Sequence, residues 1–107
     1  MRPDLVRGNL DLLVLAVLAR QPAHGYAVIE ALRERSGGHL DLPEGTVYPV
    51  LHRLEAAGHL ASEESVVDGR RRRTYAVTRE GLAAIDARKD EWRQFARVVE
   101  LVTGGAA

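Results

Sequence analysis

Residues 9–20 constrain the fold most, because their apolar side chains point in nearly every direction around a helix. One face has the spacing of a buried helical stripe, formed by Leu10, Leu13, Val14, Val17 and Leu18. The other faces carry Leu12, Leu15 and Ala16. Such a helix needs cover on more than one side, which a chain of 107 residues can hardly supply alone. We therefore expect a second copy of the chain to cover part of it.

The composition excludes several classes of protein. Apolar residues make up 46% of the chain, which is typical of a globular domain, and the absence of cysteine excludes disulfide scaffolds and thiolate zinc sites. Fifteen basic residues balance fifteen acidic ones, so any nucleic-acid site must be a local basic patch. The longest apolar stretch, residues 12–19, is about a third of a membrane span, and no signal peptide is recognisable. We expect a cytoplasmic protein with no membrane partner.

Two more helices are predicted in the first half of the chain. Gln21 and Pro22 end the first helix, and the second is expected over residues 24–35. Residues 39–42 are short enough to form a small strand. The third helix is predicted over residues 43–57, with Val47, Val50, Leu51 and Leu54 as its inward stripe. Its outer face carries Thr46, Tyr48, Pro49, His52 and Arg53.

A hairpin and a last helix follow. Residues 60–67 and 73–77 have the pattern of two strands, and Asp68-Gly69 between them is a strong hairpin signal. Four arginines come directly after this turn: Arg70, Arg71, Arg72 and Arg73. Thr78 is a suitable N-cap for a helix that runs to about residue 103.

The last helix has the seam of a short coiled coil. Ile85, Trp92 and Val99 are seven residues apart, and Phe95 and Val102 repeat the spacing three residues further on. We expect a dimer interface made by this seam and by the first helix, with Leu12, Leu15, Ala16, Ile85, Trp92, Phe95, Val99 and Val102 as its residues. A flat apolar ligand between the two chains, held by Trp92, Phe95 and Leu12, is an alternative to plain packing.

The order of these elements predicts a mostly helical α+β fold, a winged helix-turn-helix with an added C-terminal dimerisation helix. Residues 1–77 form the predicted DNA-binding domain and residues 78–107 the dimerisation helix. A helix with a polar outer face beside a basic hairpin tip suits double-stranded DNA. A solvated turn that keeps a strand edge soluble is the alternative for the arginines. The predicted DNA-binding residues are Tyr26, Thr46, Tyr48, Pro49, His52, Arg53, Arg70, Arg71, Arg72 and Arg73.

Neither a metal site nor a catalytic site is expected. The four histidines, His24, His39, His52 and His59, include no pair at the i, i+4 spacing of helical metal ligands. No nucleophile elbow, phosphate-binding loop or paired-carboxylate motif is present. We therefore expect no cofactor, no metal and no enzymatic activity.

The chain resembles the PadR family of transcriptional regulators along nearly its whole length. The matching motifs are Arg7-Gly8-Asn9-Leu10-Asp11-Leu12-Leu13-Val14-Leu15, His24-Gly25-Tyr26, Pro43-Glu44-Gly45-Thr46-Val47-Tyr48-Pro49, Leu51-His52-Arg53-Leu54-Glu55 with Gly58, residues 69–75 and Thr78-Arg79-Glu80-Gly81. The short length and single last helix resemble the compact subfamily.

This resemblance implies a cytosolic homodimer that binds a partly palindromic operator, often as a repressor. It implies that Tyr48 and its neighbours face DNA, that the arginines after Gly69 form the wing, and that the last helix packs on the first helix of the partner. Some compact members bind flat aromatic compounds at the dimer interface, and Trp92 stands in a comparable place.

Two other functions stay open from the sequence. A winged-helix module that binds protein would ignore duplex DNA and would need an exposed apolar patch outside the predicted dimer surfaces. A drug-binding protein with a secondary DNA role would bind ligand tightly without discriminating between DNA sequences.

Overall fold

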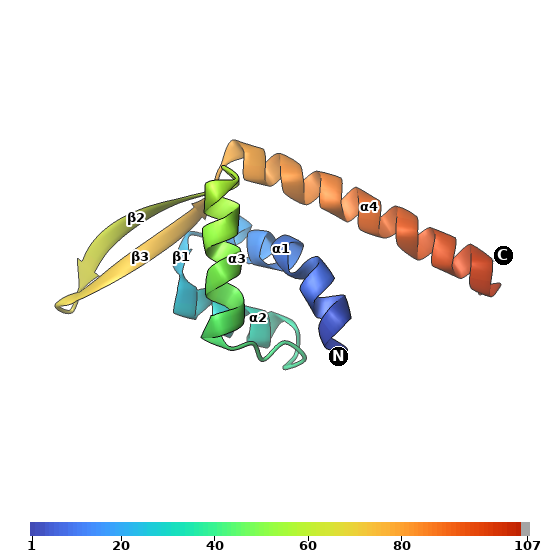
Figure 1. The fold of residues 1–107 in the computed structure, drawn as a ribbon, viewed down its shortest axis with the longest axis horizontal. Helices are drawn as coiled ribbons and strands as arrows, with labels where there is room; N and C mark the ends of the chain where they lie inside the picture. Colours follow the sequence, from blue (N-terminus) through green and yellow to red (C-terminus); the bar gives the residue numbers. More distant parts are fainter. Residues whose placement is uncertain (106–107) are drawn as a thin grey trace.

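Four helices and a three-stranded antiparallel sheet make up residues 1–105, the part of the chain that the computed structural model describes (Figure 1). The mostly helical α+β class predicted from the sequence is confirmed. The elements are α1 (Pro3–Arg20), β1 (Ala23–His24), α2 (Gly25–Arg35), α3 (Glu44–Ala56), β2 (Leu60–Val67), β3 (Arg70–Val77) and α4 (Arg79–Thr103). The last two residues of the predicted dimerisation segment, 106–107, lie outside the described part.

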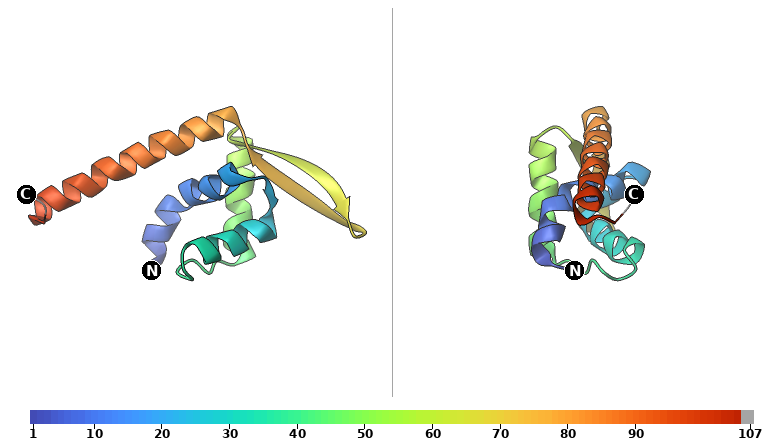
Figure 2. Two further views of the ribbon diagram at one scale, coloured as in Figure 1. Left: turned by 180° about the vertical axis from the view of Figure 1, so that it is seen from behind. Right: turned by 90° about the vertical axis from the view of Figure 1, so that its right-hand side faces the viewer.

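Two elements project from opposite sides of the helical body. The hairpin of β2 and β3 extends one way and α4 the other, with α1, α2 and α3 between them (Figures 1 and 2). The molecule is therefore elongated, with extents of 58 × 28 × 20 Å. Most of α4 and the tip of the hairpin lack cover from the other described residues.

Helix α1 begins at Pro3, six residues earlier than the apolar periodicity predicts. Proline suits the first turn because its missing N–H would have no helical partner, and Asp4 in that turn complements the helix dipole. The added turns bring Val6 into the core. The prediction missed them because only one of their side chains is buried.

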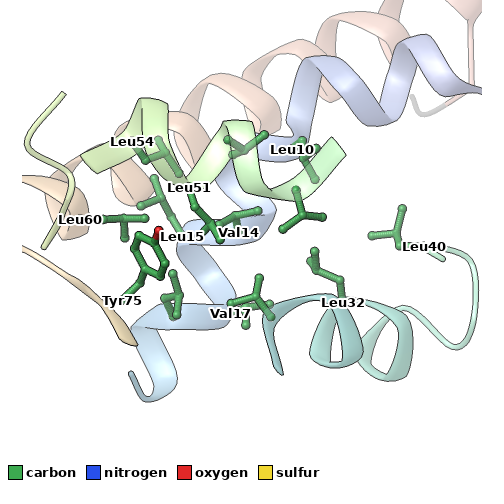
Figure 3. Close-up of a cluster of buried hydrophobic side chains, with 14 of the residues drawn as sticks. Leu10, Val14, Leu15, Val17, Leu32, Leu40, Leu51, Leu54, Leu60 and Tyr75 are labelled. Atoms are coloured by element: carbon green, nitrogen blue, oxygen red, sulfur yellow. The ribbon is translucent and has the colours of Figure 1, made fainter. Parts of the chain in front are cut away.

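Leu15 lies in the core of its own chain, which corrects the prediction that it faces a partner. Its side chain is 2% exposed and lies among Leu51, Leu54 and Tyr75 (Figure 3). The first turns of α4 close the same side of α1, where Ala84 and Arg88 line a small hollow with Leu15. The second apolar face of α1 is thus covered by α3 and α4 of the same chain. Leu12, Leu13 and Ala16 keep partial or full exposure.

The sheet differs from the prediction at its edge. No strand forms over residues 39–42, where Leu40 instead inserts into the core from a loop that includes Gly37 and Gly38 at positive φ. The third strand is β1, which the sequence analysis did not predict. It pairs with β3, so that Ala23 lies opposite Tyr75 and His24 opposite Thr74. A two-residue strand carries no periodicity of its own to reveal it.

The hairpin turn forms as predicted. Asp68 and Gly69 both have positive φ, 53° and 76°, which is the type I′ geometry favoured by the twist of paired strands. Because the loop has only two residues, β3 starts at Arg70 rather than at residue 73. All four arginines are therefore part of the strand, and their side chains alternate between its two faces.

Thr78 caps α4 as predicted and also fixes the helix to the body. Its hydroxyl accepts a hydrogen bond from the Gly81 N–H at 3.1 Å and donates to the Gly58 carbonyl at 2.6 Å. A β-carbon at Gly81 would overlap the His59 carbonyl oxygen. The close approach that glycine permits sets the direction in which α4 leaves the body.

Candidate nucleic-acid interface

Helix α3 presents a polar face to solvent beside the hairpin. Its inward stripe is buried as predicted: Val47, Val50, Leu51 and Leu54. Thr46, Pro49, His52 and Arg53 are exposed on the other side. Arg53 makes an ion pair with Asp11 of α1, so its guanidinium is held against the neighbouring helix.

Tyr48 is half-buried, which corrects the prediction that it is exposed on the outer face of α3. A β-carbon added to Gly25 would lie 2.6 Å from Cζ and 2.8 Å from the hydroxyl oxygen of Tyr48. The ring therefore packs across the first residue of α2, a position that only glycine leaves free. Its other neighbour is His52, whose ring meets it edge-on with centroids 6.4 Å apart.

A hollow of about 370 Å³ lies between the start of α2, α3 and β3. It brings together residues from three separate motifs: His24, Gly25, Tyr26, Tyr48, Arg71, Arg72, Arg73 and Tyr75. Three arginines, three tyrosines and a histidine line it. Such a set of donors can hold a phosphate group of a nucleic-acid backbone.

The arginines are divided between the two faces of the hairpin, which we call the wing (residues 60–77). Arg71 and Arg73 share a face with Glu64, whose carboxylate oxygens lie 3.5 Å from Arg71 Nη1 and 3.3 Å from Arg73 Nη2. Arg70 and Arg72 occupy the other face, and neither makes an ion pair within residues 1–105. All four side chains are exposed.

A hydrogen-bonded chain fastens the wing to α3. Arg73 Nη1 donates to the Ser62 hydroxyl at 3.0 Å, and that hydroxyl donates to Glu55 Oε2 of α3 at 2.5 Å. Because Glu55 is fixed on α3, the wing and the polar face of α3 have a defined relative position. Arg73 therefore has a structural partner that the other three arginines lack.

His24 is a site residue that the sequence analysis did not select. Its Nδ1 accepts a hydrogen bond from the Ala27 N–H at 3.2 Å and so caps α2. A nitrogen that accepts carries no proton, so the neutral ring holds its proton on Nε2. Burial and the nearby charge of Arg72 lower the pKa of His24, while Glu30 acts in the opposite direction. Its place directly before an amphipathic helix was the available signal for a cap.

Helix α4 leaves an apolar face uncovered along its second half. Trp92, Phe95, Val99 and Val102, all predicted seam residues, are 41–81% exposed. Val98 flanks this face and Leu101 lies on another side of the helix; both are exposed, and the heptad spacing selected neither. The predicted seam residue Ile85 instead packs partly against the core of its own chain. The unpartnered surface thus starts after the first turns of α4.

An apolar hollow of about 350 Å³ separates α4 from the start of α1. Of the three predicted ligand residues, only Trp92 lines it; Leu12 and Phe95 do not. Its other walls are Met1, Leu5, Val6, Asn9, Leu13, Ser36, His39 and Leu40.

Among residues 1–105 there is no cluster of three or more histidine, cysteine, aspartate or glutamate side chains suited to a metal ion. Within the same residues, no helix is both long and apolar enough to span a membrane.

The cap on α2 predicts a pH dependence of stability. Because the folded state lowers the pKa of His24, the unfolded chain takes up the proton first, and stability falls as the pH drops below about 6.5. His24→Asn keeps a capping side chain without a titrating group. The melting temperature of this variant, followed by circular dichroism, should fall less between about pH 7.5 and 5.5 than that of the wild type.

His52→Asn is the matched control, because it removes an exposed histidine that caps no helix. Its melting temperature should change with pH as that of the wild type does. Identical pH profiles for all three proteins would contradict the role of the His24 cap.

Comparison with known proteins identifies the family. The family model described as "Transcriptional regulator PadR-like family" matches residues 14–87. Transcriptional regulator Rv3488 of Mycobacterium tuberculosis is 41% identical over 96 residues, which cover 90% of this chain and 87% of that protein. These proteins are transcriptional regulators rather than enzymes.

Solved structures agree with this match. A PadR family transcriptional regulator from Eggerthella lenta superposes with a TM-score of 0.85 at 34% identity, covering 94% of this chain and 86% of that one. A transcriptional regulator from Clostridium thermocellum gives the same TM-score at 27% identity, with 91% and 95% coverage. The winged-helix arrangement is thus shared with these regulators, and the chain belongs to the PadR-like family of transcriptional regulators.

Proposed function

We propose that the chain is a cytoplasmic homodimeric repressor that binds a partly palindromic operator. The observation that carries this proposal is that three arginines of the wing line the hollow beside α3. Regulators of this family bind DNA and are typically dimeric. A local cluster of guanidinium groups gives a chain of zero net charge a basic surface in one place.

In this proposal residues 1–77 bind DNA and α3 enters the major groove. The exposed residues of its first turns, Thr46 and Pro49, would lie nearest the base edges, with His52 one turn further on. Tyr48 and Tyr26 would contact the backbone from the rim of the hollow, and the wing arginines would bind flanking phosphates. Arg53 has its carboxylate partner in Asp11, so we assign it to the positioning of α3 as well as to DNA.

Arg71→Gln tests the phosphate contact. Affinity should fall several-fold for operator and unrelated duplexes alike, because phosphates carry no sequence information. The slope of log K against log salt concentration should become shallower by about 0.9. Fluorescence anisotropy with a duplex selected from a random pool measures both quantities.

Arg97→Gln on α4 is the matched control, since it removes the same charge from an exposed site on the element that projects away from the wing (Figure 1). It should leave the slope unchanged. An unchanged slope for Arg71→Gln would remove that residue from the phosphate contacts, and a wild type that does not prefer any duplex would contradict the proposed function itself.

The dimer is proposed to form through α4 and the exposed side of α1. Trp92, Phe95, Val99 and Val102 supply the seam from α4, and Leu12 and Ala16 keep enough exposure on α1 to meet it. An apolar face of this kind on a helix that projects from the body is typical of a surface buried in an oligomer. Leu15 has no part in this interface because its own chain covers it.

Phe95→Gln should weaken the dimer. Truncation of a central aromatic contact costs about 2 kcal/mol, which raises the dissociation constant about thirtyfold. Arg97→Gln is again the control, because the same new residue lies two positions away on the opposite side of the helix. Sedimentation equilibrium over a range of concentrations compares the two. Equal dissociation constants would contradict the proposed seam.

A flat aromatic effector is proposed to occupy the apolar hollow beside Trp92 and to release the dimer from DNA. The hollow is of the size of small-molecule sites, and a ligand there could favour a spacing of the subunits that no longer fits the operator. Trp92 is the only tryptophan, so its fluorescence reports occupancy directly. A planar, non-intercalating aromatic compound should quench this fluorescence and lower operator affinity. Quenching without loss of DNA binding would contradict the regulatory part of the proposal.

A further inference from the structure

Glu64 occupies an unusual place for an acidic side chain, on the face of the wing that carries Arg71 and Arg73. The register pairs Glu64 with Arg73, and the alternation of a strand puts Arg71 on the same side. The carboxylate lies within 3.5 Å of both guanidinium groups. The Glu64 carboxylate therefore forms ion pairs with two arginines that line the proposed phosphate hollow.

The two arginines differ in what else they contact. Arg73 also donates to Ser62 and is thereby linked to α3. Arg71 is 84% exposed, and Glu64 is its only ion-pair partner within residues 1–105. Tyr75, two residues beyond Arg73 on the same face, is buried against the helices, so this face is the one that turns toward α3 at its base. An anionic ligand beside α3 can therefore replace Glu64 as the ion-pair partner of Arg71.

We propose that Glu64 is an internal competitor for DNA phosphate, which holds Arg71 when no DNA is bound and must release it on binding. The inference rests on the proposed DNA-binding function. A carboxylate and a phosphate each have two oxygen atoms that can accept hydrogen bonds from the planar guanidinium group. The two groups therefore compete for one guanidinium. The released carboxylate then lies close to the phosphate and attracts a cation from solution. Both effects lower the affinity of the wing and reduce the net release of ions.

Glu64→Gln should raise the affinity for duplex DNA about three- to fivefold, whatever its sequence, because an exposed ion pair contributes a modest free energy. The slope of log K against log salt concentration should become slightly steeper, because the charge of Glu64 no longer offsets part of the counterion release at the neighbouring phosphate. Anisotropy titrations at several salt concentrations measure both. A merely structural role of Glu64 would not move this slope.

Glu63→Gln is the matched control. It removes the same charge one residue away, on the opposite face of the strand, where Glu63 makes no ion pair with another described residue. Equal gains in DNA affinity for the two variants would mean that the change in net charge alone explains the effect, and would overturn the proposal. So would the absence of a gain for Glu64→Gln.

A double variant tests whether Glu64 acts through Arg71. The gain from Glu64→Gln should disappear in the Arg71→Gln background, and a gain that persists there would overturn the proposal. Thermal melting checks that each variant is folded, and Glu64→Thr, which suits a strand, replaces Glu64→Gln if that variant melts early. Failure of the wild type to bind any duplex would instead count against the proposed function.

Discussion

The burial of α1 is the interaction on which the rest of the structure depends. This helix contacts α2, α3, α4 and β3, so every other helix and the inner strand take their positions from it. Its buried side chains extend over a wider arc than a single stripe, from Leu10 and Val14 to Leu15 and Leu18. Each such side chain contributes about 1.5–3 kcal/mol when it leaves water. The arc is wide enough to receive α3 on one side and α4 on another, and α1 thereby fixes the position of α3 relative to α4.

The candidate interface depends on short polar links between these elements. Arg53 and Asp11 join α3 to α1, and Ser62 joins the wing to Glu55 of α3. Arg88 of α4 donates to the Gly8 carbonyl of α1 at 3.2 Å, one helical turn before Asp11. A shift of α4 relative to α1 is therefore transmitted to a helix that also holds α3. In the proposed repressor, this contact is the route by which we propose that a ligand beside Trp92 would change the presentation of α3.

Local signals in the sequence predicted most of the elements, whereas contacts between distant residues decided the features that it missed. The stripe of Val47, Val50, Leu51 and Leu54, the Asp68-Gly69 turn and the Thr78 cap each depend on neighbours within a few residues. The strand at Ala23 exists only because β3 offers it an edge. The packing of Tyr48 on Gly25 and the burial of Leu15 by α3 and α4 also require the assembled fold. For the same reason, the ion pairs of Glu64 follow from strand register and not from any motif.

Hydroxyl-radical footprinting on a selected duplex tests whether two copies of the chain present their α3 helices to DNA together. A homodimer that binds through both α3 helices should protect two patches on one face of the duplex, related by a two-fold axis and about 34 Å apart. The Phe95→Gln variant should lose both patches together, at concentrations where the wild type protects them. A single protected patch, or protection that the variant retains in full, would contradict binding by a dimer through two α3 helices.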